Sequence, residues 1–222
     1  NTGISPRSEQ LAYQQFAGMD RVVQVRPGYG LNVGMSSNRI MNYESINSEN
    51  RNIWHVGDGM VTLYNNDVTQ FNDNFWPTVN NFRLPGTTVL NGVYQESSLG
   101  KSSWAGGTDI LGLYGVTGMQ YQALGVDGLA TTPDKTLQAK KSWFMFDDEI
   151  VALGSDINST DGVTTETIVE NRKINSTGNN ALTVNGTAKS TSLGWSETMS
   201  GTNYIHLAGN VSGSDLGYYF PG

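Results

Sequence analysis

Turn signals recur along most of this chain at intervals of about ten residues, and they separate short runs in which apolar and polar residues alternate. In residues 31–36, for example, Leu31, Val33 and Met35 alternate with smaller or polar residues. An Asn-Gly dipeptide at residues 185–186 is typical of a two-residue hairpin turn. Short strands joined by tight turns favour antiparallel sheets over a parallel α/β sheet, so we expect an all-β sandwich.

The composition agrees with a β fold and excludes several classes of site. The polar residues are mainly Asn, Ser, Thr and Gly, so residues that favour helices are scarce. The absence of Cys excludes disulfides, a thiolate nucleophile and Cys-ligated metals, and two His residues leave little for a multi-histidine centre. A net charge of -7 argues against a nucleic-acid partner. No apolar run reaches about 18 residues, so we expect no membrane partner.

The two ends of the chain differ from its middle. In residues 1–20, the loose spacing of Leu11, Phe16 and Met19 predicts a short helix or a connector, and strand patterns begin only after it. The chain stops on Pro221-Gly222, directly after an apolar strand pattern. We therefore expect the sequence to be a piece of a longer protein.

Five segments carry a resemblance to a known family. They read SSNRIMNYESINSENRNIWHVGDGMVTLYNND, FWPTVNNFRLPGTTV, KSWFMFDDEIVALGSDI, ETIVENRK and LGYYFPG. In this order they resemble the central β domain of polysaccharide lyase family 8, which includes hyaluronate, chondroitin AC and xanthan lyases. One such segment alone would be a weak signal, but five in order are specific.

The resemblance implies a particular architecture. The enzymes of this family are long, secreted bacterial proteins in which a helical α/α toroid precedes an antiparallel β supersandwich. Residues 1–20 would then be the connector from a preceding helical domain, and residues 21–222 the N-terminal and middle part of the supersandwich. The expected partners are the toroid, on the same chain or on a nicked companion, and the remaining C-terminal β part.

The resemblance also implies a reaction. The family cleaves acidic polysaccharides (xanthan, hyaluronan or chondroitin) by β-elimination at a uronic acid, with Tyr, His, Asn and Arg groups supplied by the toroid. This chemistry requires no cofactor, and the present chain without the toroid is expected to be inactive. The substrate stays open at this point, and the Asn-rich composition favours xanthan.

One segment of this chain matches a family motif that belongs to the cleft. In NYESINSEN, Glu44 takes the position of a carboxylate that completes the catalytic tetrad, and Asn47 that of a substrate-binding amide. Asn50 is a plausible neighbour, and we expect Arg39 to form an ion pair with Glu44 or Glu49. A carboxylate suits the orientation of an arginine, and an amide can both donate to and accept from sugar hydroxyls. The alternative is a pair of solvated loop carboxylates.

Three further features could be functional or structural. Trp76 could stack on a sugar ring or pack under its loop, and His55 is interpreted as structural because the family's catalytic His lies on the toroid. The acidic turn, defined as Asp147, Asp148 and Glu149, could bind a structural calcium ion or could simply be solvated.

The basic residues show no site for a polyanion on this chain. Lys140-Lys141 is one of its few tight basic pairs and is interpreted as ordinary surface charge. The residues therefore leave two functions open: part of a secreted polysaccharide lyase, whose positive cleft lies mostly on the toroid, and a non-catalytic carbohydrate-binding or scaffold module.

Overall fold

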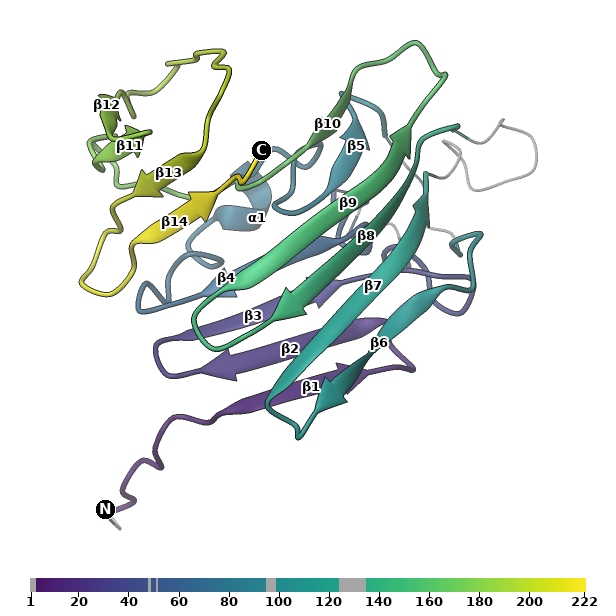
Figure 1. The fold of residues 1–222 in the computed structure, drawn as a ribbon, viewed down its shortest axis with the longest axis horizontal. Helices are drawn as coiled ribbons and strands as arrows, with labels where there is room; N and C mark the ends of the chain where they lie inside the picture. The colour runs from purple at the N-terminus through teal and green to yellow at the C-terminus, as the bar shows by residue number, and fades with distance from the viewer. Residues whose placement is uncertain (1–2, 48, 51, 95–98, 124–134) are drawn as a thin grey trace. The chain divides into compact units, whose positions relative to one another are not determined.

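The computed structural model describes residues 3–47, 49–50, 52–94, 99–123 and 135–222. The chain forms two compact units, of which the first comprises residues 1–63 and 79–171 and the second residues 64–78 and 172–222. Strands dominate both units, as Figure 1 shows, and the expected all-β antiparallel fold is confirmed. Within the described ranges, no helix is long and apolar enough to cross a membrane.

The first unit contains two four-stranded sheets and a short strand pair. The first sheet has the order β1 (Ala12–Phe16), β2 (Arg21–Arg26), β3 (Tyr29–Gly34) and β4 (Met60–Tyr64). The second sheet has the order β6 (Ala105–Ile110), β7 (Tyr114–Gln122), β8 (Gln138–Met145) and β9 (Ile150–Asn158). The short pair consists of β5 (Thr88–Leu90) and β10 (Thr165–Thr167). Figure 1 shows the two larger sheets lying one behind the other.

The core of this unit fills the space between the two sheets. Along β8, every second side chain points inward, and Trp143 is only 2% exposed. The opposite sheet contributes side chains such as Val22 and Val33, both fully buried. Two sheets joined through their inner faces form a sandwich.

The start of the chain corrects one expectation. Residues 12–16 form strand β1, which pairs antiparallel with β2, so of the short helix or connector predicted for residues 1–20 the helix is wrong. Tyr13 points into the core and is 3% exposed, whereas Leu11, Phe16 and Met19 are exposed. Their loose spacing imitated a helix face, but tertiary pairing with a strong β-strand neighbour decided the structure.

The second unit is a smaller sheet with an aromatic loop. Its strands, in sheet order, are β12 (Thr187–Lys189), β11 (Leu182–Val184), β13 (Tyr204–Leu207) and β14 (Leu216–Tyr219). The loop at residues 64–78 contains the short helix α1 (Phe75–Thr78). In this loop the ring of Phe71 meets those of Tyr64 and Phe75 at centroid distances of 4.8 and 5.1 Å. Lys173 donates hydrogen bonds to two backbone carbonyls of the loop, each at 2.8 Å.

The Asn185-Gly186 turn between β11 and β12 confirms the predicted hairpin and provides a test of it. Both residues are left-handed, with φ of 48° and 78°, and a Cβ on Gly186 would meet no atom within 4 Å. Gly186→Ala should therefore lower the free energy of unfolding by about 1 kcal/mol through backbone strain alone. Urea unfolding would measure this loss. Gly18→Ala, in a turn of ordinary φ with equally open space, is the matched control and should change little.

Candidate functional site

Glu44 is the first exposed residue after a firmly anchored stretch of chain. Just before it, Asn42 and Tyr43 are 0% and 3% exposed. The Asn42 side-chain amide donates a hydrogen bond to the Trp54 carbonyl at 2.9 Å. Glu44 itself is exposed. The buried neighbours therefore fix the backbone of Glu44, while its carboxylate is open to solvent.

The two predicted amides lie in the same exposed loop as Glu44. The amide N–H of Glu49 donates to the Ile46 carbonyl at 2.9 Å and closes a turn around Asn47. Asn47 and Asn50 have φ of 54° and 55°, a left-handed conformation that Asn tolerates better than most residues. The structure thus brings the three predicted residues into one loop, although their roles stay predictions.

Beneath this loop lies a buried turn that contains His55. The side chains of His55 and Asp58 are each 1% exposed, and His55 Nδ1 lies 2.8 Å from Asp58 Oδ2. A Cβ on Gly57 would lie 2.3 Å from the Asn42 carbonyl oxygen, so only glycine permits this close approach. Because it is buried, His55 supports the loop rather than meeting a substrate, in agreement with its structural interpretation.

A buried lysine lies in the same region. Lys141 is 6% exposed, its ammonium donates to the Gly86 carbonyl, and it lies 5.6 Å from the centre of the Trp143 ring. Burial lowers the pKa of Lys141 to about 8, although the negative charge of Asp58 acts in the opposite direction. The interpretation of Lys141 as an ordinary surface charge is therefore wrong. Its neighbour Lys140 does remain on the surface, where it forms an ion pair with Asp156.

The expected partner of Arg39 is also wrong. Arg39 binds Asp20, with 2.7 Å between Nη2 and Oδ1, rather than Glu44 or Glu49. Asp20 is 1% exposed, and a buried carboxylate competes more strongly for a guanidinium than an exposed one does. The carboxylate of Glu44 thus remains available for a group outside the described chain.

Trp76 belongs to the second unit, whereas the Glu44 loop belongs to the first. Trp76 is 38% exposed, and its ring packs edge-on against Phe75, with 5.2 Å between the centroids. Half-exposed aromatic rings of this kind can stack on a sugar, so its predicted binding role stays a prediction.

The acidic turn uses its first carboxylate for protein contacts. Asp147 Oδ1 lies 3.3 Å from Arg26 Nε, and Asp147 Oδ2 accepts a hydrogen bond from the Tyr114 hydroxyl at 3.0 Å. In the described part of the chain, no three His, Cys, Asp or Glu side chains are grouped to bind a metal ion. The expectation of calcium at Asp147, Asp148 and Glu149 therefore gains no support from the geometry.

The same turn lines an open hollow of about 520 Å³ together with Ile110, Tyr114 and Phe146. Three carboxylates around one hollow repel a polyanion, so this hollow does not suit an acidic polysaccharide. The Glu44 loop, in which the amides of Asn47 and Asn50 lie beside the carboxylates of Glu44 and Glu49, remains the better candidate for a sugar-binding surface.

Comparison with known sequences decides the family. Residues 12–222 match the sequence model of the polysaccharide lyase family 8 super-sandwich domain. The chain belongs to polysaccharide lyase family 8. It is 50% identical over 222 residues to a xanthan lyase from Bacillus sp. (strain GL1), and 36% identical over 225 residues to a hyaluronate lyase from Thermasporomyces composti. Both alignments cover 99% of this chain.

Solved structures of lyases share the fold. A Paenibacillus xanthan lyase superposes on all of this chain with a TM-score of 0.91 and 65% identity, and the chain covers 20% of it. A Streptomyces coelicolor chondroitin AC lyase, determined with chondroitin sulphate, superposes on 94% of the chain with a TM-score of 0.75 and 34% identity. The chain spans 23% and 27% of the two sequence relatives, so in this family it corresponds to a part of much longer enzymes.

Proposed function

We propose that this chain is the super-sandwich part of a bacterial lyase that cleaves an acidic polysaccharide by β-elimination at a uronic acid. In this proposal Glu44 and Asn47 are its contribution to the cleft. The observation that carries the proposal is the similarity of nearly the whole chain to xanthan, hyaluronate and chondroitin lyases. The exposed carboxylate of Glu44 on an anchored loop adds to it.

The chemical groups in the Glu44 loop indicate which roles it can fill and which must come from another domain. Residues 44–50 offer carboxylates and amides but no imidazole, phenol or ammonium group. Such groups orient an arginine and bind sugar hydroxyls. A helical domain outside this chain would supply the Tyr, His, Asn and Arg that transfer the proton and neutralise the uronate. The chain's small share of its relatives' length leaves room for that domain and for further β structure.

Xanthan is the first substrate to test. The chain is 50% identical to a xanthan lyase, against 36% to a hyaluronate lyase. Xanthan is a large polymer that stays outside the cell, so an enzyme that cleaves it would be secreted. The proposal needs no cofactor, because removal of a proton next to a carboxylate requires only a base and a neutralised carboxylate.

The decisive experiment uses the complete protein that contains this chain. β-Elimination leaves a double bond conjugated to the uronate carboxylate, and its ultraviolet absorbance should rise with xanthan and less with hyaluronan or chondroitin. The 222-residue chain by itself serves as the control and should produce no rise. If the complete protein generates no unsaturated product from any of the three polymers, it is not a lyase of this kind. Binding without cleavage would then favour a carbohydrate-binding module.

A further inference from the structure

Asp20 is a buried carboxylate with a left-handed backbone conformation, and it lies at the turn between β1 and β2. It is 1% exposed and has a φ of 49°. Its Oδ1 accepts from Arg39, its Oδ2 accepts from the Ser37 hydroxyl, and its carbonyl accepts from the Met35 amide at 3.0 Å. A carboxylate this deeply buried is stable only with such partners. Asp20 thus connects the β1–β2 turn to the chain that leaves β3.

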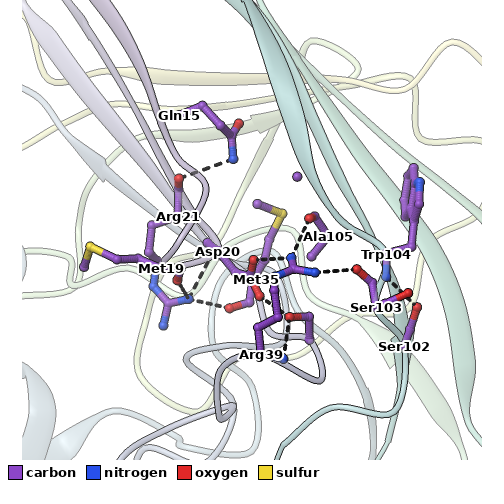
Figure 2. Close-up of polar contacts among 12 residues, drawn as sticks. Gln15, Met19, Asp20, Arg21, Met35, Arg39, Ser102, Ser103, Trp104 and Ala105 are labelled. Carbon is purple, nitrogen blue, oxygen red and sulfur yellow. Dashed lines mark hydrogen bonds and ion pairs between the residues drawn. The ribbon is translucent and has the colours of Figure 1, made fainter.

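Arg39 extends this connection to the second sheet. As Figure 2 shows, its guanidinium also donates to the Ser103 carbonyl at 2.6 Å and to the Ala105 carbonyl at 2.8 Å, just where β6 begins. Two backbone contacts run alongside it, from the Asn38 amide to the Ser102 carbonyl and from the Gly100 amide to the Ser37 carbonyl, each at 2.9 Å. The planar fork of an arginine is needed to reach three acceptors in two directions.

Both terminal nitrogens of Arg39 bind protein acceptors. Nη1 binds Ser103, and Nη2 binds both Asp20 and Ala105. Although the Arg39 side chain is 44% exposed, its donors point to protein acceptors. Recognition of a uronate through both terminal nitrogens of Arg39 would compete with these bonds.

The chain between Arg39 and Glu44 is short and held at a second point. The Asn42 side-chain amide donates to the Trp54 carbonyl at 2.9 Å, and Tyr43 is buried. The Arg39 contacts and the Asn42 contact thus hold the same short segment at two points, and loss of the Arg39 contacts removes one of the two supports of the Glu44 loop. We propose that Asp20 and Arg39 form a positioning pair that sets where Glu44 and Asn47 stand in the cleft. This inference rests on the proposed function.

The test is a double-mutant cycle in the complete enzyme. Arg39→Ala should lower kcat about tenfold with little change in KM, because misplacement of a group that orients the reaction affects the transition state most. In a Glu44→Gln background, the same Arg39→Ala change should cost less than about twofold, since the group that it positions is already gone. Arg39→Lys should resemble Arg39→Ala, because a single ammonium cannot replace the fork.

The controls separate positioning from simple loss of structure. Arg83 also forms an ion pair, with Glu166, and its side chain is likewise 44% exposed. Arg83→Ala should leave turnover unchanged. If Arg39→Ala does not fold, Ser37→Ala removes the hydroxyl that donates to Asp20 and accepts from the Arg39 backbone amide. It leaves the Arg39 side chain in place and should lower kcat by about threefold, again only when Glu44 is present.

The possible failures can be told apart. Equal losses from Arg39→Ala with and without Glu44 would refute positioning, and so would a rise in KM alone, which would indicate direct substrate binding. An active wild-type enzyme with an unaffected Arg39→Ala variant would refute this inference and leave the proposed function standing. A wild-type enzyme that cleaves none of the three polymers would refute the proposed function itself.

Discussion

Glu44→Gln in the complete enzyme should lower kcat about 100-fold and leave KM nearly unchanged. The change keeps the size of the side chain and removes its charge. Glu44 is exposed, and its neighbours Asn42 and Tyr43 are buried, so the loop should keep its backbone conformation. What is lost is the charge-assisted hydrogen bond that would orient a cleft arginine during proton transfer. Initial rates of unsaturated-product formation at several polymer concentrations would measure both constants.

Glu49→Gln is the matched control for this prediction. Glu49 is exposed in the same loop, and its known contacts there use its backbone rather than its carboxylate. Its replacement should leave kcat within about twofold of the wild type.

Undiminished turnover in Glu44→Gln would remove Glu44 from the site. A rise in KM at constant kcat would instead assign it to substrate binding.

The sequence predicts those parts of the fold that depend on local rules. The Asn185-Gly186 hairpin follows from the φ values that its two residues tolerate, and the burial of Trp143 follows from its apolar strand. Local spacing wrongly predicted a helix at residues 12–16, because pairing with β2 makes this segment a strand. The second unit combines residues 64–78 with residues 172–222, and no local pattern indicates which distant segments will pack together.

The candidate site shows the same limit. Its exposed loop could be recognised from the Glu44 and Asn47 motif, but the support below it could not. Arg39 has two nearby glutamates in sequence, yet the fold places a buried aspartate next to it. For Lys141 a signal did exist: it stands two residues from Trp143 in an alternating strand, and that spacing predicts an inward side chain.

Lys141 makes the stability of the first unit depend on pH in an unusual direction. The pKa of Lys141 is about 8 in the folded chain, against 10.5 for an ordinary lysine, so the unfolded chain holds this proton more tightly. The charged lysine therefore destabilises the fold by about 3 kcal/mol below pH 8, and this penalty disappears as the pH rises toward 10.5. Tyr13 has the opposite effect at higher pH. Burial raises its pKa from 10.0 to about 12, so it lowers the stability of the fold only above pH 10.

The free energy of unfolding should thus increase by about 2 kcal/mol between about pH 7.5 and about pH 9.5. Urea unfolding of the chain, followed by tryptophan fluorescence, would measure it. Lys141→Met should abolish the increase, because a thioether does not titrate. Lys140→Met is the control: Lys140 is 57% exposed, so its replacement should keep the full increase. If the Lys141→Met variant gains stability with pH as the wild type does, another group carries the proton, and the charge of Lys141 is not what destabilises the sandwich.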